Sequence, residues 1–203
     1  MELLATICED FREMAKLRGK PCSGFAVLDT LLIPGMLAVI LFRISHFFYI
    51  HRIRILSRFF YLLNIVLFSC DIAPPAEIGP GLVIGHPVGI IIGGPSKAGR
   101  NLKLFGQCGL GGSARRNIAL DGFPECGDNV IIFIGARVFG PIKIGSNAVI
   151  AANAVVMRDV PAGGTAIGVP ARVRFFPDPL YGQQASALSD TSALPSSVRD
   201  ASV

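Results

Sequence analysis

The histidine at position 86 is the residue of this sequence best placed to do chemistry. It lies in the segment Ile84-Gly85-His86-Pro87-Val88-Gly89, and Asp71 precedes it by fifteen residues. An imidazole oriented by a carboxylate is a general base poised near neutral pH. The alternative is a turn histidine that only hydrogen-bonds the backbone. The other histidines, His46 and His51, stand beside aromatic residues and arginines, and we expect them to pack rather than react.

A six-residue repeat from Asp71 to about Arg172 must position this pair. An aliphatic or small residue opens each unit, and Gly, Asn or another small residue follows. No helix has this period, whereas a β-solenoid coil of three short strands repeats every eighteen residues or so, about three hexads. One residue per hexad is expected to point inward, and Gly or Asn at the corners accepts positive φ. The expected inward residues are Ile72, Ile78, Ile84, Ile92, Ala98, Leu104, Leu110, Cys126, Ile132, Val138, Ile144, Ile150 and Val156.

The repeat divides the chain into three parts. Residues 1–68 are predicted to be α-helical, residues 69–176 to form the solenoid, and residues 177–203, rich in Ser, Ala, Gln and Pro, to be a disordered tail. Gly112 to Pro124 is too polar and aperiodic to continue the coil. An excursion of this kind from a rigid coil is where function is expected to concentrate.

The helical part is predicted to contain an apolar helix pair, after a first helix from Leu4 to Leu17. The pair covers Phe25 to Ile50 and Ile53 to Phe68, and its longest uncharged run has thirteen residues. A bilayer span needs about twenty, so we expect a buried helix pair. A peripheral contact at the inner membrane surface is the alternative, through the nearby arginines and Phe47, Phe48, Phe59 and Phe60.

Composition argues against several other classes of protein. The net charge of +5 is modest, and only residues 51–60 mix basic and aromatic residues, so no nucleic-acid partner is expected. Five scattered cysteines without CxxC spacing predict a reduced, cytoplasmic protein with no disulfide and no metal site. Glu2, Glu9 and Asp10 occupy the place of a basic signal-peptide region, so no signal peptide is expected.

Four motifs resemble the serine O-acetyltransferase branch of the hexapeptide-repeat acyltransferases. They are Cys70-Asp71-Ile72-Ala73-Pro74, Gly85-His86-Pro87-Val88-Gly89, Leu110-Gly111-Gly112 and Ala166-Ile167-Gly168-Val169-Pro170-Ala171-Arg172. The resemblance implies a left-handed parallel β-helix and a homotrimer, with acetyl-CoA as cosubstrate in a groove between adjacent solenoids.

The resemblance also implies roles for individual residues. The imidazole of His86 would take the proton of an acceptor hydroxyl, with Asp71 orienting it, and the oxygen would attack the thioester without an acyl-enzyme. Backbone N–H groups near Gly111 and Gly112 could approach the thioester, although a simple turn explains these glycines as well. The implied contacts of the pantetheine arm are Gly135, Ala136 and Ala152, and those of the CoA phosphates are Arg172 or Lys143.

The acceptor contacts of the resemblance are missing. Lys20 and Gly85 stand where the family has acidic residues, and Gly122-Phe123 stands for an Arg-His pair. Because an ammonium site without carboxylates recognises serine poorly, a sugar in polysaccharide biosynthesis is the predicted acceptor. Phe123 could face the sugar ring, or it could be a lid residue that packs on the neighbouring subunit. Serine acetylation with a rebuilt pocket is the alternative, and a non-catalytic scaffold is the rival. Family members that dock on cysteine synthase typically end in Ile, so Val203 puts that docking in doubt.

Overall fold

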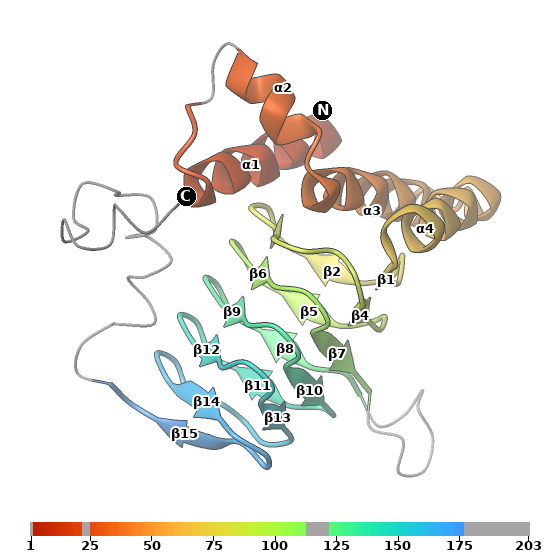
Figure 1. The fold of residues 1–203 in the computed structure, drawn as a ribbon. Coiled ribbons are helices and arrows are strands. Elements are labelled where there is room, and N and C mark those ends of the chain that lie inside the picture. The colour runs from red at the N-terminus through yellow and green to blue at the C-terminus, as the bar shows by residue number, and fades with distance from the viewer. Residues whose placement is uncertain (1, 22–24, 113–121, 177–203) are drawn as a thin grey trace, which may run out of the picture.

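The computed structural model describes residues 2–21, 25–112 and 122–176. In these ranges four helices precede fifteen short strands, and the strands wind into a solenoid below the helices (Figure 1). The fold class predicted from the hexads is therefore confirmed. The predicted tail 177–203 and the centre of the predicted excursion, residues 113–121, lie outside the described residues.

The N-terminal part is helical, as predicted, but its second segment is divided. Because proline lacks an N–H and fits the first turn of a helix, Pro34 begins a new helix instead of continuing the previous one. The helices are α1 (Glu2–Leu17), α2 (Phe25–Leu31), α3 (Pro34–Ile50) and α4 (Arg54–Phe68).

The strands form three sheets, and from β1 to β10 each strand neighbours the strand three places further along the chain. Their orders are β1-β4-β7-β10-β13, β2-β5-β8-β11 and β3-β6-β9-β12-β14-β15, and all the pairs are parallel except the last, β14 with β15. The strands are β1 (Cys70–Ile72), β2 (Glu77–Ile78), β3 (Val83–Ile84), β4 (Ile90–Ile92), β5 (Lys97–Ala98), β6 (Lys103–Leu104), β7 (Gly109–Gly111), β8 (Glu125–Cys126), β9 (Ile131–Ile132), β10 (Arg137–Phe139), β11 (Lys143–Ile144), β12 (Val149–Ile150), β13 (Val155–Val156), β14 (Thr165–Ile167) and β15 (Arg172–Arg174).

The residues expected to point inward form the core of the solenoid. All are buried except Ala98, which is half-buried and packs against the same core. The stacking follows the strand register, since Ile84 pairs with Leu104 and Leu104 with Ile132 on successive coils. Each buried aliphatic side chain contributes about 1.5–3 kcal/mol, so this column stabilises the coil along its whole length.

One corner of the solenoid is held by a column of asparagines. Asn101, Asn129 and Asn147 adopt the left-handed conformation, with φ of 59°, 56° and 59°. Asparagine tolerates this conformation because its short side chain can hydrogen-bond locally. The Nδ2 of Asn101 donates to Oδ1 of Asn129 (2.9 Å), and Nδ2 of Asn129 donates to Oδ1 of Asn147 (3.1 Å). The polar corner residues therefore satisfy one another between coils.

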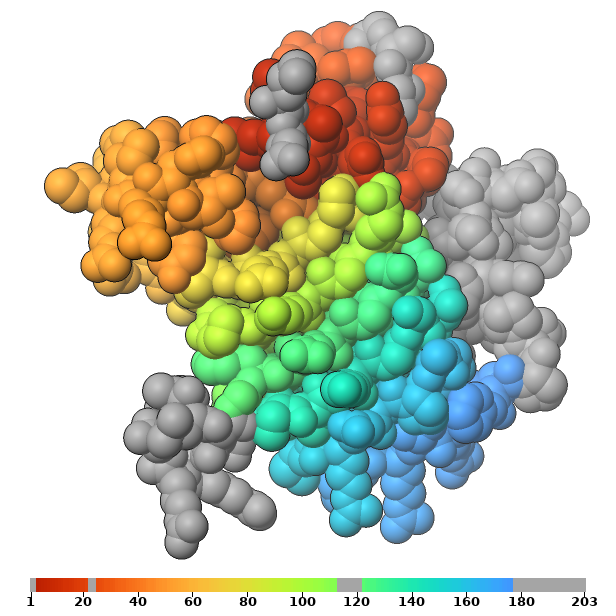
Figure 2. All heavy atoms as spheres, turned by 180° about the vertical axis from the view of Figure 1, so that it is seen from behind, coloured from red at the N-terminus to blue at the C-terminus, as the bar shows by residue number. Residues whose placement is uncertain are grey.

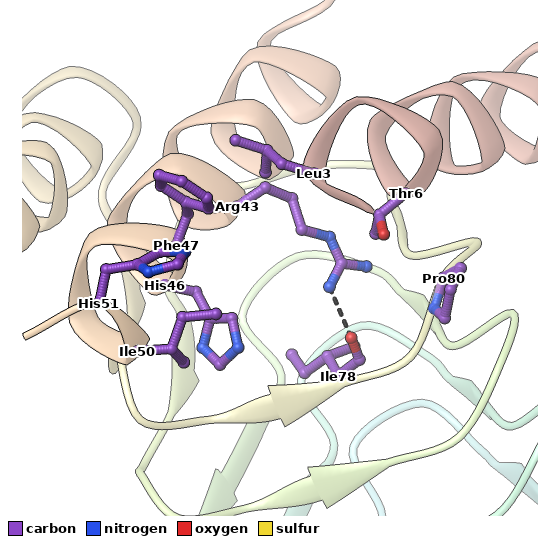
Figure 3. Close-up of a pocket in the computed structure, with 9 residues that line it drawn as sticks. All are labelled: Leu3, Thr6, Arg43, His46, Phe47, Ile50, His51, Ile78 and Pro80. Carbon is purple, nitrogen blue, oxygen red and sulfur yellow. Dashed lines mark hydrogen bonds between the residues drawn. The ribbon is translucent and has the colours of Figure 1, made fainter. Parts of the chain in front are cut away.

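The helices close the first coil through a buried ion pair between Asp10 of α1 and Arg43 of α3. Arg43 Nε donates to Asp10 Oδ2 at 2.8 Å, and Nη2 donates to the carbonyl of Gly79 at 2.7 Å. Nη1 donates to the carbonyl of Ile78 at 2.5 Å (Figure 3). Asp10 Oδ1 accepts the N–H groups of residues 81 and 82, both at 2.8 Å. Because both charges are fully hydrogen-bonded, the open end of the solenoid is sealed without an unpaired buried charge.

Only one helix of the predicted buried pair is largely buried. On α4 the buried side chains are Ser57 and Asn64, whereas Ile55, Phe59, Leu62 and Val66 are exposed. The reason is polar packing on α3: the Ser57 carbonyl accepts Ser45 Oγ at 2.9 Å, and Asn64 Nδ2 donates to the Ala38 carbonyl at 3.1 Å. The hairpin of α3 and α4 projects from the side of the molecule (Figure 2).

Among the described helices, none alone has the length and apolar character of a membrane span. Helices α2 and α3 meet that test only when taken together, and the chain bends by 69° between them.

Candidate active site

His86 lies in the turn that joins β3 to β4 and is exposed to solvent. Backbone hydrogen bonds fix this turn: the Gly89 N–H donates to the carbonyl of Ser69 at 2.9 Å, and the Ile90 N–H donates to that of Pro87 at 3.2 Å. The next coil passes directly against it, since a Cβ at Gly106 would lie 3.2 Å from the Cβ of His86. The structure therefore presents the imidazole to solvent from a rigid corner.

Asp71 points outward from the middle of β1, between the buried Cys70 and Ile72. Its outward direction follows from the alternation of side chains along a strand. The Tyr61 hydroxyl donates to Asp71 Oδ1 at 2.9 Å. Within the described residues, no hydrogen bond joins Asp71 to His86, so the single chain does not form the predicted pair.

Tyr61 of α4 was not recognised from the sequence as a neighbour of Asp71. Burial raises the pKa of its phenol, and the hydrogen bond and the charge of Asp71 raise it further, while the charge of Arg58 lowers it. The phenol is therefore a neutral donor to the carboxylate over the physiological range. The only sign of this contact in the sequence was that the helix containing Tyr61 ends just before the strand containing Asp71.

Aromatic rings lie beside the turn that carries His86. A Cβ at Gly85 would lie 2.8 Å from Cδ1 of Phe105, so any larger residue at position 85 would have to displace that ring. Phe105 stacks on Phe133 of the next coil, with ring centroids 5.3 Å apart and planes 9° apart. Both phenylalanines directly follow an inward residue, as Gly85 follows Ile84, and this shared register was the signal in the sequence that could have revealed them.

Two of the predicted contacts of the pantetheine arm, Gly135 and Ala152, lie in turns of later coils that stack on the turn of His86. The Gly135 N–H donates to the carbonyl of Gly106 at 3.1 Å, and Ala152 is exposed in the equivalent turn of the following coil. Gly135 has φ of 73°, which favours glycine. Ala136 differs, because its side chain is fully buried in the core and cannot contact a ligand on the surface.

A different corner of the solenoid carries Gly111, Gly112 and Phe123. It lies at the C-terminal end of β7, whereas the corner of His86 lies at the N-terminal end of that strand. The Phe123 ring covers this corner, because a Cβ at Gly112 would lie 3.1 Å from its Cζ and a Cβ at Gly93 would lie 2.5 Å from its Cε1. Strand β7 separates the two corners. One chain therefore does not bring these residues to His86.

The remaining predicted site residues are scattered. Lys143 is exposed on β11, in another sheet, and Lys20 is exposed in the turn after α1. Arg172 of β15 lines a cavity of about 600 Å³ at the last coil, together with Arg158, which the sequence analysis missed. Two guanidinium groups suit the phosphates of CoA, so the residues present fit that part of the cosubstrate.

The other two histidines pack as predicted. A ring nitrogen of His46, Nδ1, lies 2.8 Å from the carbonyl of Pro74, and the His51 ring lies 4.3 Å from that of Phe47 (Figure 3). Within the described ranges, no group of three or more His, Cys, Asp or Glu side chains could hold a metal ion.

Comparisons with known proteins identify the family of this coil. No family model matches the chain. It is 33% identical over 171 residues to a serine acetyltransferase of Synechococcus elongatus, covering 84% of this chain and 68% of that protein. A serine acetyltransferase of Helicobacter pylori is 34% identical over 142 residues, which are 70% of this chain and 82% of the relative.

Solved structures agree with these relatives. The serine acetyltransferase of Neisseria gonorrhoeae superposes with a TM-score of 0.77 at 32% identity, covering 88% of this chain and 69% of that one. A serine acetyltransferase in complex with CoA superposes with a TM-score of 0.74 at 29% identity, covering 85% and 70%. The chain therefore belongs to the serine acetyltransferase family of hexapeptide-repeat, left-handed β-helix proteins, and it is an acetyl-CoA-dependent acyltransferase.

Proposed function

We propose that the enzyme transfers acetyl from acetyl-CoA to a hydroxyl acceptor, with His86 as the general base. The exposed imidazole on a rigid corner is the observation that carries this proposal. The acceptor oxygen forms its bond to the acetyl carbon as its proton passes to the imidazole. The carbon–sulfur bond then breaks, and the imidazolium returns the proton to the CoA sulfur.

Asp71 orients the imidazole in this proposal, and Tyr61 orients Asp71. A carboxylate has two oxygens, and the Tyr61 hydroxyl occupies only Oδ1. The other oxygen can accept an N–H of His86 when that side chain turns towards β1. The phenol thus holds the carboxylate in place as a positioning residue.

A homotrimer would complete the site, because the corner of His86 and the corner of Gly112 lie apart on one chain. In a trimer, one corner of each copy could face the other corner of its neighbour. The sheet between the corners supports this assembly, since Ile91 and Phe139 are exposed on it. Exposed apolar residues that gather on one face typically mark a contact surface.

L-serine is the first candidate acceptor, because the similar proteins are named serine acetyltransferases. This order reverses the expectation from the sequence, which placed a sugar first. The proposed pocket must then bind the ammonium group of serine without an acidic residue at position 85.

An uncharged polyol, such as a sugar, is the second candidate, and one contact favours it. The Phe105 ring fills the space beside Gly85, so an apolar surface lies next to His86 where an ammonium group would require a carboxylate. The double variant Gly85→Asp/Phe105→Leu would exchange that surface for an acidic one. We expect it to lower the KM for L-serine under either candidate.

The test is release of the CoA thiol from acetyl-CoA, measured with L-serine, with a free hexose and with no acceptor. We expect release with L-serine that falls by about 10²–10⁴-fold in His86→Ala. His51→Ala is the matched control, because that histidine packs on Phe47 away from the site, and it should keep full activity. Release with the hexose alone would establish the second candidate, and equal release by wild type and His86→Ala would refute the proposed base.

A further inference from the structure

We propose that the hairpin of α3 and α4 docks on an anionic lipid surface and binds a lipid phosphate between Arg54 and Arg58. The proposal is independent of which acceptor the enzyme uses. It depends on the outward face of α4, the charges of the hairpin and a cavity beside that helix.

The outward face of α4 is apolar over its whole length. Ile55, Phe59, Leu62 and Val66 recur at spacings of four, three and four residues and form a stripe along one side of the helix. Ile55 and Val66 are 85% and 77% exposed. The fully buried side chains of the helix are Ser57 and Asn64, so the four apolar side chains of the stripe stay uncovered in the single chain. A helix with this arrangement requires an apolar environment on its outer face.

The charges of the hairpin are all positive. From Thr30 to Cys70 the sequence contains no Asp or Glu. Arg43 is buried in its pair with Asp10, whereas Arg52, Arg54 and Arg58 are exposed and form no ion pair with any described residue. A surface of this charge is complementary to anionic lipid headgroups.

A cavity of about 450 Å³ lies beside Arg54 and Arg58, between α4 and the turn 73–75 that follows β1. Arg54, Ser57 and Arg58 line it from α4, and Tyr49 and Tyr61 line it with their rings. The Arg58 guanidinium lies 5.8 Å above the centre of the Tyr61 ring, which holds it at the rim. Two guanidinium groups one helical turn apart can together bind a single phosphate.

A lipid surface accounts for the stripe and the cations together. Because no described helix can span a bilayer alone, the hairpin is expected to lie in the interface, with the stripe among the acyl chains and the arginines at the phosphates. A second copy of the hairpin would cover the stripe but would bring unpaired arginines together. Free phosphate would fill the cavity and leave the stripe uncovered.

The test is flotation of the full-length protein with vesicles of phosphatidylcholine, or of phosphatidylcholine and phosphatidylglycerol in equal amounts. We expect wild type to float with the anionic vesicles only. Each arginine near an anionic surface strengthens binding about fivefold, so Arg54→Gln/Arg58→Gln should lower the partition roughly 25-fold. The charge-matched control is Arg158→Gln/Arg174→Gln at the other end of the solenoid, which should float like wild type.

The stripe has its own variant, Phe59→Ser/Leu62→Ser, and its own control, Met157→Ser/Phe175→Ser, which removes exposed apolar residues elsewhere. Only the stripe variant should lose flotation, with unchanged circular dichroism and unchanged mass by light scattering. A lower mass for that variant would assign the stripe to a second copy. Wild type that fails to float, or an arginine variant that floats fully, would each overturn the proposal.

Discussion

Asp10, which binds the first coil from α1, and Asp71, which belongs to that coil, are carboxylates that the structure uses in opposite ways. Asp10 is fully buried, and Arg43 and two backbone N–H groups fill its hydrogen-bonding capacity. Asp71 is half-buried, and Tyr61 is its one hydrogen-bond partner among the described residues. A saturated buried carboxylate fixes the helices on the solenoid, whereas a carboxylate with a spare oxygen can take part in chemistry.

Removing the saturated carboxylate should have the largest effect on stability. Asp10→Ala leaves Arg43 as a buried charge without its partner, and we expect a loss of about 3–5 kcal/mol in the free energy of unfolding. Urea denaturation of wild type and variant measures it. The control is Asp29→Ala, which breaks an exposed pair with Arg18 and should change stability by about 1 kcal/mol or less. Equal losses in the two variants would mean that burial does not distinguish these pairs.

Removing the charge of the other carboxylate should affect catalysis instead. Asp71→Asn keeps the size of the side chain but cannot hold the imidazolium, and we expect kcat to fall by about 10²-fold. The unfolding midpoint should stay close to that of wild type. The contrast between the two carboxylates would be contradicted if Asp71→Asn were as destabilised as Asp10→Ala while its folded molecules kept the wild-type kcat.

The smallest expected effect concerns the phenol that holds Asp71. Tyr61→Phe removes one hydrogen bond to a carboxylate and should destabilise the protein by about 1–2 kcal/mol at neutral pH. Burial raises the pKa of Tyr61 in the folded protein above its ordinary value of 10.0, and the hydrogen bond to Asp71 raises it further. The unfolded chain therefore loses this proton first. The contribution is complete below pH 10.0 and disappears as the pH rises through the folded pKa.

Urea titrations at neutral pH and above pH 10 test this difference. Wild type should lose more stability over the alkaline step than Tyr61→Phe does. The matched control is Tyr49→Phe, which alters an exposed tyrosine of the same cavity and should retain the wild-type alkaline loss. An alkaline loss of stability that is the same in Tyr61→Phe and wild type would contradict the proposal that Tyr61 holds the Asp71 carboxylate.

The coil could be predicted because its rule is local. Each inward residue, such as Ile84 or Ile132, needs only its position in the hexad to be placed in the core. The direction in which α4 faces could not be predicted in this way. Its apolar content suggested burial, but Ser57 and Asn64 select the buried side through hydrogen bonds to α3, a partner that periodicity does not identify.

The candidate site was predictable in its residues but not in its contacts. The motif indicated His86 and Asp71, and both lie at the first coil. The bond of Asp71 to Tyr61 joins a strand to a helix, and the Phe105 ring reaches Gly85 from the next coil. Both contacts depend on how coils and helices stack, so spacing along the chain carries little information about them.

The excursion between β7 and β8 leaves and rejoins the coil without shifting its register. On the near side, Leu110 pairs with Ile92, and on the far side Cys126 pairs with Ala98, each in step with the coil above. The intervening segment can therefore change in length or composition while the scaffold keeps its shape. A coil that keeps its register across an inserted segment gives an enzyme architecture a place where new contacts to other molecules can be added without rebuilding the scaffold.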